Sequence, residues 1–149
     1  TFLHETIGWN FSFTEMQAAI GISQMKKLSK IINIKRKIFE FYKKKITNKK
    51  LFMQPIPNST SHPVHWFSNI HCNDAKFLEN YLNKNNIPTR RLFFPLNRQP
   101  CFKNNDNVVN LNEEFLGSEF AYKKILSLPS SILLDMEQKE FIVNVINKY

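Results

Sequence analysis

The 149-residue sequence contains no apolar run long enough to cross a membrane, and its first residues lack an export signal of charged then apolar residues. Cysteine is scarce: Cys72 and Cys101 do not form a Cys-x-x-Cys pair and lack the paired spacing of a zinc site. We therefore expect a soluble, cytoplasmic protein in which both cysteines are ordinary core or boundary thiols.

The four histidines form no recognisable set of metal ligands. His62 and His65 are three residues apart, but Pro63 lies between them on a segment expected to be extended. His65 and His71 share one face of a strand only if regular strand joins them. No carboxylate cluster accompanies them and no nucleophile and base are paired, so we assign neither a metal site nor a catalytic residue.

A net charge of +9 raises the possibility of nucleic-acid binding, because phosphates attract lysine and arginine. Many of the basic residues, however, fall within residues 26–50, on one predicted helix and the turn after it. A solvated helix face explains them with fewer assumptions. A hydrophobic content of 42% and 14 phenylalanines also favour a folded core over disorder.

Two capping boxes mark helix starts, at Thr14 with Gln17 and at Asp135 with Gln138. The helix after Thr14 carries a small, apolar face, including Ala18 to Gly21, which we expect to pack against a part of the protein not present here. Helical pattern resumes over residues 27–47 after a break near residues 28–29. The side chains expected on its buried side are Leu28, Ile31, Ile32, Ile38, Phe41 and Tyr42.

Short strands and helices alternate after residue 48, which predicts an α+β unit. Strands are expected at residues 51–53, 64–71, 87–94 and 125–128; helices are expected at 73–82 and 113–124 and from Asp135 onward, and residues 101–111 read as a polar loop. We therefore divide the chain into an interface loop with linking helices, residues 1–48, and a small domain, residues 49–149. Residues 1–48 are expected to lie outside the core of that domain.

Three segments carry a resemblance to a known family, and they occur in its order. They are residues 8–19 (GWNFSFTEMQAA), residues 87–100 (IPTRRLFFPLNRQP), and residues 126–130 (LSLPS) with 133–138 (LLDMEQ). Together they resemble the C-terminal part of the DegT/DnrJ/StrS family of pyridoxal-phosphate sugar aminotransferases, in particular perosamine-synthase-like members. The strand around Trp66 also fits.

The resemblance implies the small domain of an aspartate-aminotransferase-type fold (fold type I), with a largely antiparallel sheet covered by helices. It implies an enzyme that transfers an amino group, usually from glutamate, to a keto sugar on a nucleotide, as in the biosynthesis of polysaccharides such as the lipopolysaccharide O-antigen. In the family the Schiff-base lysine lies upstream, so this chain is expected to be inactive alone. Its expected partners are a second copy, in a homodimer, or a missing N-terminal pyridoxal-phosphate domain.

The resemblance also assigns site residues. Asn10 matches an asparagine that contacts the cofactor phosphate of the other subunit; taken by itself, it could equally fix its own turn. The positions that fall where the family lines its sugar-nucleotide entrance are Thr89, Arg90, Phe94 and Asn97. Arg90 could hold a diphosphate through bidentate hydrogen bonds or simply lie at the surface. Asn97 stands where the family commonly has histidine.

Two further departures bear on substrate identity: Ser12 replaces a usual arginine and Arg91 a common proline.

Two rival hypotheses about function stay open. One is a non-catalytic remnant or interaction module that uses the small-residue helix face, and the other is a basic nucleic-acid-binding domain.

Overall fold

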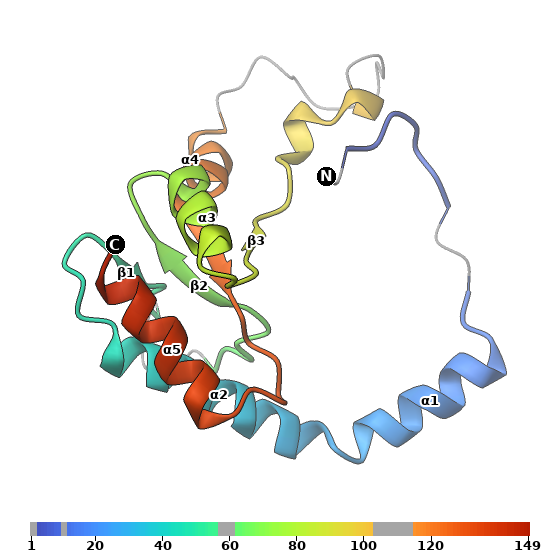
Figure 1. Ribbon diagram of the computed structural model, residues 1–149. Helices are drawn as coiled ribbons and strands as arrows, with labels where there is room; N and C mark the ends of the chain where they lie inside the picture. Colours follow the sequence, from blue (N-terminus) through green and yellow to red (C-terminus); the bar gives the residue numbers. More distant parts are fainter. Residues whose placement is uncertain (1–2, 10–11, 57–61, 103–114) are drawn as a thin grey trace.

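The computed structural model describes residues 3–9, 12–56, 62–102 and 115–149, and these form an α+β fold of helices around one small sheet (Figure 1). The helices are α1 Glu15–Met25, α2 Leu28–Lys45, α3 Ala75–Lys84, α4 Leu116–Lys124 and α5 Met136–Asn147, with 3-10 turns η1 Leu96–Arg98 and η2 Pro100–Phe102. The strands are β1 Phe52–Met53, β2 Ser68–His71, β3 Arg90–Arg91 and β4 Ile125–Leu128.

The sheet has the strand order β1-β2-β4-β3, and each neighbouring pair is antiparallel, as the family resemblance implies. Register places Met53, Ile70, Leu126 and Arg91 in one row across the strands. The first three are buried in the hydrophobic core, so this row faces the core. Because successive side chains point to opposite faces of a strand, Arg90 faces the other way.

The core joins this row of the sheet to side chains from three helices. Those that are almost completely buried are Phe39 and Tyr42 from α2, Leu78 and Leu82 from α3, and Ile146 from α5. The expectation that residues 1–48 lie outside the core is therefore wrong for the second half of α2. Its apolar stripe at Ile38, Phe39 and Tyr42 is buried against the rest of the domain, while the lysines Lys43 to Lys45 of its last turn are exposed.

Helix α1 projects away from this unit and buries none of its side chains (Figure 1). The predicted capping box is confirmed: the Thr14 hydroxyl accepts from the Gln17 backbone N–H, and the Gln17 side chain accepts from the Thr14 N–H. The break from α2 comes at residues 26–27, slightly earlier than predicted. Met16 is 77% exposed and Ile20 64% exposed, so α1 has no stabilising packing within the described chain.

The strands are shorter than the sequence suggests. His65 adopts the left-handed backbone region (φ 53°) and stacks on Phe39 with ring centroids 3.9 Å apart, so regular strand begins only at Ser68. The segment predicted as strand over residues 87–94 pairs only at Arg90 and Arg91. Most of the predicted polar loop at 101–111, and the start of the helix predicted at 113, lie outside the described residues.

Helix boundaries follow side-chain caps where the chain offers them. The helix expected at residues 73–82 is α3, and Asp74 caps it because its carboxylate accepts from the Lys76 and Phe77 backbone N–H groups. Phe77, in the first turn of α3, is 68% exposed. The capping box at Asp135 is confirmed. No described helix combines the length and apolarity needed to cross a membrane.

We predict that Tyr42→Phe destabilises the fold by about 1–2 kcal/mol, because it leaves the Pro129 carbonyl without a donor. The Tyr42 side chain is fully buried, and its hydroxyl donates to the Pro129 carbonyl at 2.8 Å. Urea unfolding measures the loss. Tyr81→Phe is the matched control, since the Tyr81 hydroxyl makes a longer bond of 3.3 Å to Val145 at a half-buried position. An equal or larger loss for Tyr81→Phe would contradict the assignment.

A second prediction concerns the two thiols. Cys72 is buried, its Sγ donates to the Lys124 carbonyl, and burial raises the pKa of the thiol from 9.0 to about 11. At pH 8 about one Cys72 in a thousand is then a thiolate, the form that alkylates. We expect iodoacetamide to modify the less buried Cys101 first, as measured by peptide mass spectrometry of the folded chain. Equal rates at the two cysteines would show that Cys72 is not shielded.

Candidate functional site

Arg90 lies on the face of β3 that points away from the core row. Its guanidinium carbon is 5.3 Å from the centroid of the Phe67 ring and 5.2 Å from that of Phe93. Both distances are typical of cation–π contacts. Two aromatic rings, one before β2 and one after β3, therefore limit where the guanidinium can lie.

A row of hydrogen-bonded polar side chains runs across the same face of the sheet toward Arg90. Asn69 donates its amide to Gln54 at 2.9 Å, and the Ser127 hydroxyl donates to Asn69 at 2.8 Å. Ser127, only 3% exposed, is the register partner of Arg90 on the neighbouring strand. The row fixes β2 and β4 side by side and so positions the strand that carries Arg90.

Arg90 and Phe94 line one groove of about 570 Å³, together with Thr89, Arg91, Lys76 and Tyr122 among others. The Phe94 ring meets the Tyr122 ring edge-on at 5.6 Å, and the Arg98 guanidinium lies 4.8 Å from the centroid of Phe94. Phe94 is therefore a wall of this groove. The structure brings these two predicted residues together, whereas Asn97, half-buried on η1, is not among the lining residues.

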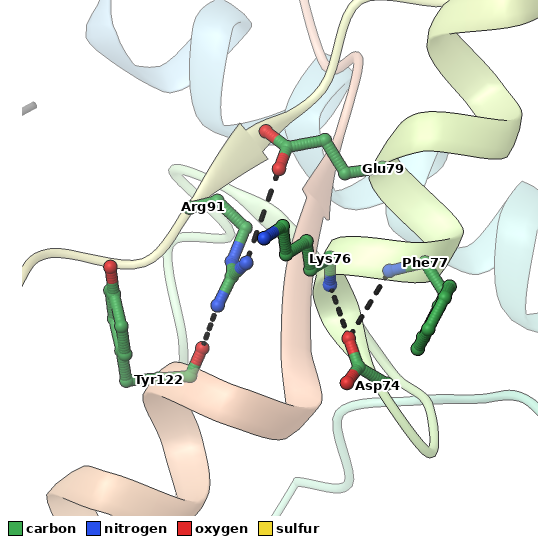
Figure 2. Close-up of polar contacts among 6 residues, drawn as sticks. All are labelled: Asp74, Lys76, Phe77, Glu79, Arg91 and Tyr122. Atoms are coloured by element: carbon green, nitrogen blue, oxygen red, sulfur yellow. Dashed lines mark hydrogen bonds and ion pairs between the residues drawn. The ribbon is translucent and has the colours of Figure 1, made fainter.

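The sequence analysis treats Arg91 only as a departure from a common proline and assigns it no role at the site. In the structure, Arg91 lines the groove. Its Nη2 donates to the Tyr122 carbonyl at 2.6 Å, and its Nη1 lies 4.0 Å from the Glu79 carboxylate (Figure 2). Its guanidinium carbon also lies 4.9 Å from the centroid of the Tyr122 ring. Arg91 could have been noticed from the alternation of side chains along a strand, because two consecutive arginines on a strand point to opposite faces.

The described N-terminal segment, residues 3–9, is hydrogen-bonded through His4 to the region of η1 and η2. The His4 backbone N–H donates to the Gln99 side chain at 2.9 Å, and the Cys101 N–H donates to the His4 carbonyl at 3.0 Å. Leu3 lines the same groove as Arg90. The predicted cofactor ligand, Asn10, follows on this segment but lies outside the described residues.

Two of the four histidines, His65 and His71, pack against aromatic rings. His65 stacks on Phe39, and His71 stacks on Phe52 at 4.7 Å. Burial lowers the pKa of both imidazoles, which favours their neutral form. Within the part of the chain that the structure describes, no three His, Cys, Asp or Glu side chains are grouped as metal ligands.

Comparison with known proteins gives a consistent result. The chain is 28% identical to GDP-perosamine synthase of Vibrio cholerae, over 98% of this chain and 40% of that protein. It is also 28% identical to GDP-perosamine synthase of Escherichia coli O157:H7, over 98% of this chain and 39% of that protein. The chain thus spans about two fifths of the length of these curated relatives.

Solved structures show the same fold. The sugar aminotransferase CalS13 from Micromonospora echinospora superposes with a TM-score of 0.76 at 17% identity, over 95% of this chain and 37% of that one. The aminotransferase TlmJ from Streptoalloteichus hindustanus superposes with a TM-score of 0.75 at 20% identity, over 89% of this chain and 35% of that one. The five helices and small antiparallel sheet of the described residues are therefore an architecture found within aminotransferases.

The family model of the DegT/DnrJ/EryC1/StrS aminotransferases matches residues 1–147, nearly the whole sequence. This match agrees with the order of the three sequence segments and with the fold. The chain belongs to the DegT/DnrJ/EryC1/StrS aminotransferase family.

Proposed function

We propose that the chain is the C-terminal portion of a pyridoxal-phosphate-dependent aminotransferase that acts on keto sugars carried by a nucleotide diphosphate, with glutamate as the amino donor. Family membership over residues 1–147 carries this proposal. The names of two relatives, both GDP-perosamine synthases, support a nucleotide sugar as substrate. On the same resemblance, we propose a cytoplasmic enzyme of polysaccharide biosynthesis.

Arg90 is proposed to bind the diphosphate of the substrate. A guanidinium offers paired N–H donors that match two phosphate oxygens. The rings of Phe67 and Phe93 restrict its position, so less conformational entropy is lost when the anion binds. Phe94 is proposed to wall the sugar side of the groove, and Asn97 to contribute a hydrogen bond where the family commonly has histidine.

Pyridoxal phosphate, when bound, supplies the electron sink for amino transfer. Asn10 is proposed to donate its side-chain amide to the cofactor phosphate of the partner subunit. The described residues can form only part of the active site. The groove at β3 offers cations and aromatic walls suited to a phosphorylated substrate. We therefore assign the groups that hold the cofactor ring, including the lysine, to the N-terminal portion of the enzyme, and expect this chain alone to be inactive.

Residues 1–48 are proposed to form the interface with that N-terminal portion and with the second subunit of a homodimer. Phe13 is 83% exposed, and Ile20, Ile22 and Met25 of α1 are each more than 60% exposed. Apolar side chains presented on one isolated helix mark a surface that another part of the protein covers. The N-terminal three fifths that the curated relatives possess is the occupant we propose, since this chain matches only the remainder.

The same exposed face of α1 supports the second candidate function, a non-catalytic module that pairs with an aminotransferase subunit. The two functions differ in whether the paired assembly aminates a sugar.

We predict that the chain, co-produced with the N-terminal portion of the Vibrio cholerae GDP-perosamine synthase, aminates a GDP-linked keto sugar with glutamate. Removing the charge-assisted bonds of Arg90 in Arg90→Ala should lower kcat/KM by about tenfold or more. Product is measured by mass spectrometry. Lys50→Ala, at an exposed turn before β1, is the control and should leave kcat/KM unchanged.

An assembly that forms without aminating any keto-sugar nucleotide would favour the non-catalytic module. Activity of the 149-residue chain by itself would contradict the assignment of the cofactor-binding lysine to another segment. Equal activity of Arg90→Ala and the unaltered chain would remove Arg90 from the substrate site.

A further inference from the structure

A second cavity, of about 460 Å³, lies between α3, β3 and the end of α4, on the core side of β3. Four basic residues line it: Lys76, Arg91, Lys123 and Lys124. It shares Lys76, Arg91 and Tyr122 with the 570 Å³ groove, so the two spaces adjoin at these side chains. Figure 2 shows Lys76 and Arg91 side by side above the capped start of α3.

Among the residues that the structure describes, two carboxylates neighbour these cations, and neither balances them fully. Asp74 accepts the backbone N–H groups of Lys76 at 2.8 Å and Phe77 at 3.1 Å, so its Oδ1 is already used as the cap of α3. Glu79 lies 4.0 Å from Arg91 Nη1, at the outer limit of an ion pair. Contacts at that distance contribute little. The cavity therefore keeps an excess of positive charge.

Two polar atoms near Lys76 also lack partners. The Nε of Arg91 and the Oγ1 of Thr89 are buried and have no hydrogen-bond partner among the residues that the structure describes, and both residues line the groove that Lys76 lines. A buried polar group without a partner destabilises the folded state, so such groups are few in folded proteins. A small rearrangement of the Arg91 side chain would let its Nε–H donate to a bound anion. The negative charge of that anion would then balance the neighbouring cations.

We infer that Lys76 and Arg91, with Lys123 and Lys124 at the rim, form an anion site for a phosphoryl-bearing small molecule. Arginine pairs two oxygens in a plane, and lysine adds a point charge from another direction. A phosphoryl group has three oxygens to share between them, whereas a carboxylate has two. Arg90 lines the adjoining groove together with Lys76 and Arg91 but does not line this cavity. Binding of pyrophosphate to the cavity needs no amino transfer, so the inference can fail independently of the aminotransferase proposal.

Arg91 also has a structural role that the test must separate from binding. Its bond to the Tyr122 carbonyl ties β3 to the last turn of α4. Lys76 is exposed and lies on the first turn of α3, which Asp74 already caps through the backbone. Lys76→Gln therefore removes charge from the cavity with little effect on folding.

The test titrates the 149-residue chain with inorganic pyrophosphate at constant ionic strength, by isothermal calorimetry. We expect saturable binding that Lys76→Gln and Arg91→Gln each weaken by about tenfold, the loss of one charge-assisted contact. Lys84→Gln is the matched control: it removes the same charge from the exposed last turn of the same helix and should leave the affinity unchanged. Thermal unfolding of each variant checks that it is folded.

Several outcomes would overturn the inference. Absence of pyrophosphate binding to the unaltered chain would show that the cavity is not an anion site. Equal weakening by Lys84→Gln would show only a diffuse effect of the net positive charge. Tighter binding of glutarate than of pyrophosphate would make the site one for carboxylates. If Arg91→Gln unfolds the chain, Lys76→Gln decides, and unchanged pyrophosphate affinity in that variant contradicts the site.

Discussion

The packing of the second half of α2 against the sheet is the constraint on which the other features depend. Tyr42 is fully buried in the core, and its hydroxyl bonds to the carbonyl of Pro129, just after β4. Phe39, also buried, supports His65 and so determines where β2 can begin. The position of β4 then sets β3 and both of its arginines. Helix α1 projects outward from the start of α2 and buries none of its side chains against the described residues.

This arrangement separates two tasks along one chain. The sheet and helices α2, α3 and α5 supply the side chains of the hydrophobic core, whereas α1 presents apolar side chains and buries none of them. At the far edge of the sheet, β3 turns one arginine toward aromatic rings and the other toward α3 and α4. In an aminotransferase, the first of these faces would meet the substrate, and α1 would hold the cofactor-bearing portion.

Local signals in the sequence predicted local structure well. The capping boxes at Thr14 and Asp135 depend on residues three apart, and both are confirmed. Features that depend on distant contacts were missed. The left-handed backbone of His65 reflects its stacking on Phe39. Helical spacing correctly placed Ile38 and Tyr42 on the buried side of α2, but it did not reveal that they join the core of the small domain, because that core includes strands from later in the sequence. Family motifs located Arg90 and Phe94, but only the register of β3 reveals that Arg91 faces α3 and α4.

Hydrogen exchange along the two N-terminal helices tests the central claim most directly. In the 149-residue chain alone, amides of α1 should exchange nearly as fast as in an unfolded peptide, while those near Tyr42 in α2 should be protected by the core. On assembly with an N-terminal aminotransferase portion, α1 should become protected and α2 should change little. Protection of α1 in the isolated chain, or its continued fast exchange in an active assembly, would contradict the account.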